Sequence, residues 1–417
     1  MANCQVLRSA ISPSKWPHVF GAAFFAGFFI ASATAQSRFL PPDSAVVLSS
    51  SVQAGGGKQS SLRALDKAWH AQPLDQNAAF AYARAVFTLG LNEGDLRWFG
   101  SAKAALGPWW QKADLPAEAY FLRGLVKQGF HDFNAGLQDI NQAIELEPGR
   151  AEFWSWRFAL HLLLADMSAA QQDIDQIERL IGKAEADIYR GILWYRTGQP
   201  AKAVQTLRRA IQAPHNQDAS SQVWLRFHLG EAHRVEGQAS QAIAVWEQGL
   251  KASPQSHLLR LSLADVLNQQ GEFGKAKKVA MNQVDTQSMT DALLMQALIA
   301  SRGLKDADEL RMANQIDARL KAQALRQESL IERPKLIYQI AYGSDLAAGL
   351  ALSIENWQLQ KEPPDAILFV QAALALGQAQ SAKPVVMWAD QTGYIDPQLN
   401  SLLKQLKAHP SWLKKSP

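Results

Sequence analysis

The stretch "HLGEAH" at residues 228–233 places two histidines around a glutamate, which are residue types that bind zinc and support metal-assisted hydrolysis. Zinc-binding helices carry two histidines four residues apart, with a glutamate as general base. His228 and His233 are five residues apart, and at roughly 100° per residue they point about 140° apart around a helix. His228 and Glu231 could share one helix face, but a zinc site needs at least a third protein ligand, and the sequence does not identify one. We expect no metal ion here.

Other catalytic arrangements are also missing from the sequence. The single cysteine is Cys4, and no Gly-x-Ser-x-Gly motif occurs. The glycine-containing runs at 55–58 and 90–97 lack the terminal Lys-Ser/Thr of a phosphate-binding loop. Acidic pairs such as Asp306 and Asp308 are typical of solvated helix faces. We therefore predict a protein that is not an enzyme, with no catalytic residues and no cofactor.

The elements that carry these residues are predicted to be helices. After residue 58, apolar residues recur at spacings of three and four, and no convincing strand alternation occurs. Helical segments repeat with steps of 34, 33, 39, 34 and 33 residues, and the long step contains the insertion "APHNQDAS" at 213–220. The repeats start at Ala117, Ala151, Ala184, Val223, His257 and Thr290.

The repeated letters have a physical reason. Two helices packed roughly 8 to 10 Å apart need small side chains where they cross. The repeat puts small residues at its eighth and twentieth positions, large ones at the twenty-fourth, and glycine at the fifteenth, where the first helix ends. Pro148 and Pro254 are predicted to stop second helices. The eighth, twentieth, twenty-fourth and fifteenth positions are, in that order, Gly124, Gly191, Gly230 and Ala264; Gly136, Ala170, Ala203, Ala242 and Ala276; Ile140, Ile174, Leu207 and Trp246; and Gly198, Gly237 and Gly271.

This pattern resembles the tetratricopeptide repeat (TPR) family. The resemblance implies an all-α solenoid, a right-handed superhelix of antiparallel helix pairs. The repeat array is predicted over 117–325. Residues 59–116 and 326–417 keep the rhythm but lose the small-residue register, so both are predicted to be degenerate repeats that cap the array. Parts of the chain also resemble secreted or periplasmic bacterial TPR proteins of unassigned function.

The N-terminus predicts export. Residues 19–30 form an apolar run of 12 residues that follows two basic residues and precedes "ASATAQ". This is typical of a signal peptide, here 1–35, whose cleavage leaves a periplasmic or secreted protein that is not in the membrane. Residues 36–58, with two prolines and three consecutive glycines, are predicted to be a flexible linker.

Charge excludes one class of partner. The formal net charge is +4, and loss of residues 1–35, which hold Arg8, Lys15 and no acidic residue, lowers it to +2. Nucleic-acid-binding domains usually carry a strong basic excess, so we expect no nucleic acid partner. The sequence does not indicate an oligomeric state.

The TPR resemblance implies that ligands lie in the groove lined by the first helix of each repeat. Aromatic residues among arginines, acids and amides are typical of a peptide-recognition surface. The alternative is that some of these side chains pack against neighbouring repeats. The Lys, Asn and Arg set with which some family members grip a C-terminal carboxylate is not found. The candidate partner-binding residues are Ile188, Tyr195, Arg196, Trp224, Phe227, His228, Glu231, Arg234, Asp265 and Asn268.

The leading hypothesis is an exported, non-enzymatic scaffold that binds a protein or an extended peptide in a cell-envelope assembly. A second hypothesis, a carbohydrate-binding or cell-wall-processing accessory protein, rests on the 13 tryptophans, although most of these are expected to pack between helices. A third is a membrane-tethered assembly factor whose N-terminal segment is not cleaved.

Overall fold

The computed structural model describes residues 56–413 except 96, 214–217, 283–285, 287–288 and 326–332. The predicted signal peptide and most of the predicted linker lie outside these residues, although α1 begins at Gly56, within the last three linker residues. The described residues form helices and no strand. None of the helices in this part of the chain has the length and apolar character needed to cross a bilayer.

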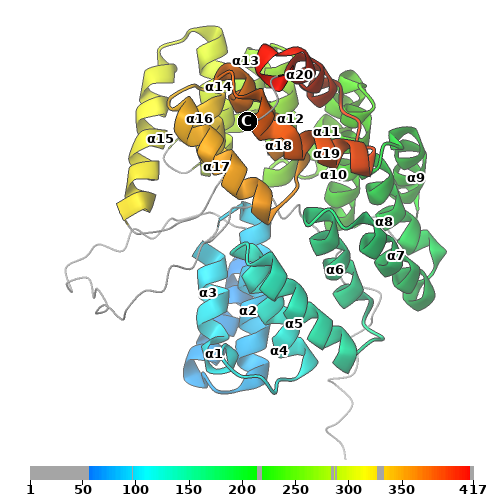
Figure 1. Cartoon of the computed structure of the whole chain (residues 1–417). Coiled ribbons are helices and arrows are strands. Elements are labelled where there is room, and N and C mark those ends of the chain that lie inside the picture. Colours follow the sequence, from blue (N-terminus) through cyan, green and yellow to red (C-terminus); the bar gives the residue numbers. More distant parts are fainter. Residues whose placement is uncertain are drawn as a thin grey trace, which may run out of the picture.

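The helices alternate with short turns along the whole described chain (Figure 1). Their bounds are α1 Gly56–Ala71, α2 Gln76–Glu93, α3 Arg97–Ala105, η2 Gly107–Trp109, α4 Ala117–Gly129, α5 Phe133–Leu146, α6 Ala151–Leu163, α7 Met167–Ile181, α8 Lys183–Arg196, α9 Pro200–Gln212, α10 Ala219–Val235, α11 Ala239–Ala252, α12 His257–Gln269, α13 Phe273–Met281, α14 Asp291–Leu304, α15 Asp308–Leu325, α16 Arg333–Ile340, α17 Leu346–Leu359, α18 Pro363–Ala375, η5 Ala379–Ala382, α19 Lys383–Thr392, α20 Pro397–Ala408 and α21 Pro410–Leu413.

From α2 to α19 the helices form consecutive pairs, and the turn within each pair has the same geometry. One residue in each turn has a positive φ, and successive examples lie 33 to 39 residues apart. Glycine, which lacks a Cβ, adopts this conformation without strain. The pattern extends beyond the repeats identified in the sequence, because it recurs in the α2–α3 turn and in the two pairs from α16 to α19. These residues are Gly94, His131, Ala165, Gly198, Gly237, Gly271, Lys305, Gly343 and Gly377.

The predicted crossing of the two helices in a repeat is confirmed. A Cβ added to Gly124 would lie 2.9 Å from the carbonyl oxygen of Gly136 and 2.9 Å from Cγ1 of Ile140. In another repeat, a Cβ on Gly230 would lie 2.1 Å from Nε1 of Trp246. Trp246 is fully buried, and its indole N–H donates to the carbonyl of Phe227 at 3.3 Å. In these two repeats, glycine at the eighth position is therefore needed for the second helix to approach so closely.

The array curves so that its C-terminal helices return to its middle. Figure 1 shows the orange and red C-terminal helices beside the green α8 and α10. One hydrophobic core joins them, since it contains Tyr189 and Leu225 of the array together with Phe369 and Leu399 of the C-terminal part. The first helices of the middle repeats are therefore covered on one side by residues more than 100 positions later in the sequence.

Candidate functional site

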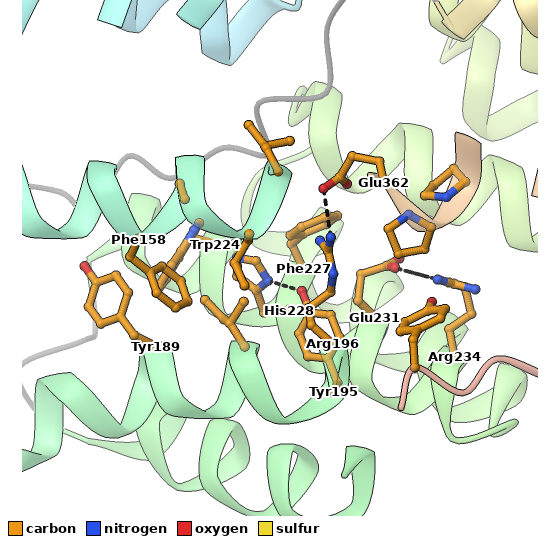
Figure 2. Close-up of a pocket in the computed structure, with 17 residues that line it drawn as sticks. Phe158, Tyr189, Tyr195, Arg196, Trp224, Phe227, His228, Glu231, Arg234 and Glu362 are labelled. Carbon is orange, nitrogen blue, oxygen red and sulfur yellow. Dashed lines mark hydrogen bonds and ion pairs between the residues drawn. The ribbon is translucent and has the colours of Figure 1, made fainter. Parts of the chain in front are cut away.

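A cavity of about 90 Å³ lies where this C-terminal part meets the first helices of three consecutive repeats (Figure 2). Its wall consists of residues from α6, α8 and α10, together with the start of α18 and Tyr394, which follows α19. Most of this wall is apolar, because rings and aliphatic chains from the three array helices line it. The few polar groups lie toward the C-terminal ends of α8 and α10.

The apolar side of the cavity is built from aromatic rings. Tyr189 stands edge-on to Phe158 with ring centroids 5.5 Å apart, and it packs against Trp224 at 5.9 Å. Trp224 in turn meets His228 edge-on at 4.8 Å. Such pairs fix one another's orientation as well as burying apolar surface. The rings therefore form a preorganised apolar wall across α6, α8 and α10.

His228 is held in this wall as a neutral ring. Its Nδ1 is hydrogen-bonded to the hydroxyl of Tyr195 at 2.8 Å. Burial, together with the nearby Arg196 charge, lowers the pKa of His228 to about 3. Burial likewise raises the pKa of the Tyr195 hydroxyl above its ordinary value. Both groups are therefore uncharged at neutral pH and serve the cavity as hydrogen-bonding, polarisable surfaces.

Arg196 forms a buried ion pair with the C-terminal part of the chain. Its Nη2 donates to the Glu362 carboxylate at 3.0 Å, and the two side chains are 8% and 3% exposed. Burial opposes the charge of Arg196, but Glu362 outweighs it and raises the pKa of the guanidinium. The Nε of Arg196 is buried and has no hydrogen-bond partner among the described residues.

Arg234 forms the corresponding link one repeat later. Its Nε and Nη2 donate to Glu231 at 3.1 and 3.0 Å, and its Nη1 donates to Asp396. Burial opposes this charge as well, but Glu231, Tyr394 and Asp396 together raise the pKa of Arg234 well above its ordinary value. The polar end of the cavity thus carries balanced pairs of opposite charge rather than an excess of either sign.

The backbone closes the same edge of the groove. The amide of Lys361 donates to the carbonyl of Leu163, at the end of α6, at 2.8 Å. A Cβ on Gly198, in the turn after α8, would lie 2.2 Å from the carbonyl oxygen of Gly393. The C-terminal part therefore sits directly on the ends of the first helices and leaves the cavity as a pocket closed on that edge.

One protein-family model matches part of the chain. Residues 227–279, which contain the second half of α10 through most of α13, match the family model described as tetratricopeptide repeat. This part of the chain therefore contains tetratricopeptide repeats. No curated protein sequence matches it.

Solved structures share the fold. The Cut9–Hcn1 hetero-tetramer of APC/C matches with 13% identity and a TM-score of 0.50, covering 85% of this chain and 73% of that one. The Rap protein complexed with Competence and Sporulation Factor matches with 12% identity and a TM-score of 0.46, covering 84% of this chain and 98% of that one. PilW, a type IV pilus biogenesis factor, matches with 18% identity and a TM-score of 0.39, covering 50% of this chain and 96% of that one. At these identities the similarity concerns the fold.

The TPR register brings most of the ten candidate partner-binding residues to one place. Ile188 does not line the cavity but lies buried in the core, and Asp265 and Asn268 lie one repeat further on. The Asn268 amide donates to Gln296 at 2.8 Å, and Asp265 accepts from Gln296 at 3.2 Å. Burial raises the pKa of Asp265 to about 6 although Arg234 opposes the shift. The seven that line the cavity are Tyr195, Arg196, Trp224, Phe227, His228, Glu231 and Arg234.

No local sequence pattern indicated the opposite wall of the cavity. Glu362, Pro363 and Tyr394 line the cavity, yet in the sequence the prolines only mark a break between helices. Nothing periodic connects these residues to α8 and α10, because the ion pair from Arg196 spans 166 positions. Tyr189 does lie within a repeat, but at a position that the family register does not assign to the groove.

The two histidines of "HLGEAH" point to different partners. His228 bonds to Tyr195, whereas Nδ1 of His233 lies 2.8 Å from the side-chain oxygen of Gln238 in the next turn. Within the residues that the structure describes, no three His, Cys, Asp or Glu side chains gather as a metal site. The letters of this stretch follow the packing of α10.

Proposed function

We propose that this protein is an exported, non-enzymatic scaffold that holds a segment of a partner protein in the cavity between α6, α8, α10 and α18. TPR domains bind protein or peptide partners, and the fold is that of an interaction scaffold. The observation that carries the proposal is the aromatic cavity on the inner side of three consecutive repeats.

The size and lining of the cavity favour a particular mode of binding. A dry cavity of roughly 150 Å³ holds a benzene molecule, so about 90 Å³ suits one aliphatic side chain. Interfaces draw most of their binding energy from a few apolar anchors in such pockets. The C-terminal part closes one edge of the groove, so the partner segment inserts an anchor side chain from the open side and does not run through the whole groove.

The compartment follows from the N-terminal sequence. A signal peptide over 1–35 would place the mature chain in the periplasm or outside the cell, where a binding scaffold serves a cell-envelope assembly. The intact mass of the protein recovered from its compartment tests this step. A mass that lacks residues 1–35 supports export with cleavage, and a mass that retains them favours the membrane-tethered alternative.

The carbohydrate-binding alternative is not favoured by the tryptophans. Sugar platforms need an exposed ring face, and the tryptophans in the described part of the chain are buried or half-buried. Trp224, Trp156 and Trp388 are 3%, 5% and 5% exposed, and each contributes to the packing between helices.

A cavity-filling variant tests the binding proposal. Ala159 lines the cavity from α6 and is only half-buried, so Ala159→Leu fills the cavity without removing a core side chain. We expect affinity capture with the full chain to recover a protein partner, and a peptide from that partner to bind the wild type. Ala159→Leu is expected to weaken peptide binding at least about tenfold, which is roughly 1.4 kcal/mol.

The matched control is Ala201→Leu, which adds the same side chain to an exposed position of α9. This control is expected to bind the peptide as the wild type does. Equal binding by the Ala159→Leu variant would place the partner elsewhere on the protein and overturn the proposal.

A further inference from the structure

A second hollow lies on the other side of α10, among α9, α10 and α11. It is a recess of about 510 Å³. Two arginines, Arg208 and Arg226, and three glutamines, Gln212, Gln222 and Gln248, line it together with aliphatic side chains. None of the lining residues is acidic. The recess therefore combines positive charge with amide groups, unlike the apolar cavity on the inner side.

The recess and the cavity are separated by the helix itself. Gln222 and Arg226 lie four residues apart on α10, so they share one face. Phe227 and Glu231, which line the cavity, share another face of the same helix. The recess is lined by the last turn of α9, by α10 and by α11. A ligand in the recess would not compete with a segment in the cavity.

Among the residues that the structure describes, no carboxylate forms an ion pair with Arg226. Its Nη1 donates to the neutral side-chain oxygen of Gln222 at 2.5 Å. Burial lowers the pKa of Arg226, with no carboxylate to oppose the shift. The pKa of Arg234, eight residues later on α10, is instead raised, because the carboxylates of Glu231 and Asp396 lie beside it. Partly buried charges in proteins are usually paired, so the surroundings of Arg226 favour an anion.

We propose that this recess binds a small polyhydroxylated ligand that carries an oxyanion, such as a sugar phosphate or a sugar acid. Arg208 and Arg226 would hold the oxyanion, because guanidinium groups donate in pairs to phosphate and carboxylate oxygens. The side chains of Gln212 and Gln248 each carry amide donors and an acceptor, which suits hydroxyl groups, whereas Gln222 accepts from Arg226 and donates to the carbonyl of Ile211 at 3.0 Å. The volume of the recess lies in the range of roughly 300 to 1,000 Å³ that is usual for small-molecule sites.

Calorimetric titration of the full chain tests this site with four probes: glucose 6-phosphate, glucuronate, glucose and inorganic phosphate. We expect at least one anionic sugar to bind, and to bind more tightly than inorganic phosphate, while uncharged glucose does not bind. Binding of glucose 6-phosphate alone identifies a phosphate as the oxyanion, and binding of glucuronate alone identifies a carboxylate. Affinity should fall as salt is added, because the attraction between charges is screened.

Two variants localise the binding. Arg226→Gln removes the partly buried charge and is expected to weaken binding about tenfold or more, as loss of a charge-assisted hydrogen bond does. Arg209→Gln removes the same charge one residue from Arg208, but Arg209 is exposed and does not line the recess. This control should bind as the wild type does, and thermal unfolding checks that both variants are folded.

Three results would overturn the proposal: no binding of either anionic sugar, binding that is unchanged by Arg226→Gln, and equal weakening by Arg209→Gln. The last result would indicate general attraction to a basic surface. Because the peptide test uses a different face of α10, either proposal can fail while the other stands.

Discussion

At the scale of single residues, burial decides which side chains of the cavity carry charge. Arg196 and Arg234 stay charged because carboxylates from the C-terminal part lie against them. His228 has no acidic neighbour of this kind, and burial keeps it neutral. The register predicted that these residues share one helix wall. Their charge states depend on Glu362 and Asp396, whose positions no local pattern predicts.

The neutral state of His228 makes the stability of the fold depend on pH. An unfolded histidine titrates near 6.5, whereas the pKa in the folded protein is about 3. Between these values the unfolded chain binds a proton that the folded chain does not, so this contribution to stability is present above pH 6.5 and is lost as the pH falls. At pH 5 the loss from this one residue should be about 2 kcal/mol.

His228→Gln tests this expectation, because glutamine cannot titrate and can still bond to Tyr195. In urea unfolding at pH 7.5 and pH 5, the variant is expected to lose about 2 kcal/mol less stability than the wild type. His70→Gln, at an exposed ring in α1, provides the control for substitution of a histidine. Equal losses in His228→Gln and the wild type would show that protonation of His228 does not limit the fold.

At the scale of helices, the repeat was predictable because its signal is local. Small residues at the crossing and glycine in the turn recur with the period, and the structure confirms both. In other turns the positive-φ residue is His131, Ala165 or Lys305. An aspartate follows each of these three residues, and the Asp132 and Asp166 side chains accept from the backbone N–H groups that begin the next helix. In turns without glycine, an aspartate that caps the next helix therefore marks the turn. A search of the sequence for glycine alone misses these turns.

The close approach of α10 and α11 at Gly230 can be tested by substitution. Gly230→Ala would bring a methyl group to 2.1 Å from Nε1 of the fully buried Trp246. Forcing an extra carbon into a packed core costs about 1 to 3 kcal/mol, which exceeds or offsets the gain of roughly 1 kcal/mol from replacing a helical glycine. We expect Gly230→Ala to be less stable than the wild type in urea unfolding.

Gly100→Ala is the matched control, because this residue is exposed on α3 and a Cβ there meets nothing within 4 Å. It should gain about 0.5 to 1 kcal/mol. If the two variants showed the same stability change, close approach of α11 would not explain the glycine at 230.

At the scale of the whole molecule, the C-terminal helices were the least predictable part. The sequence indicates their helical rhythm, and the helix pairs from α16 to α19 have that rhythm. It does not indicate that they return to α8 and α10, because that arrangement depends on the summed curvature of the preceding pairs. The contacts that fix it, such as Arg196 with Glu362, join residues 166 positions apart.

This long-range link can be tested through Glu362. Glu362→Gln would leave the charge of Arg196, 8% exposed, without a carboxylate partner, and breaking one side of a buried ion pair typically costs about 3 to 5 kcal/mol. The double variant Arg196→Met with Glu362→Leu removes both charges and should recover much of this loss. Asp390→Asn breaks only the exposed pair with Lys407, so its effect should stay below about 1 kcal/mol.

If Glu362→Gln unfolded in urea no more easily than Asp390→Asn, the ion pair between Arg196 and Glu362 would not hold the C-terminal part on the array. If the double variant were as unstable as Glu362→Gln, the loss would come from packing rather than from the unpaired charge of Arg196.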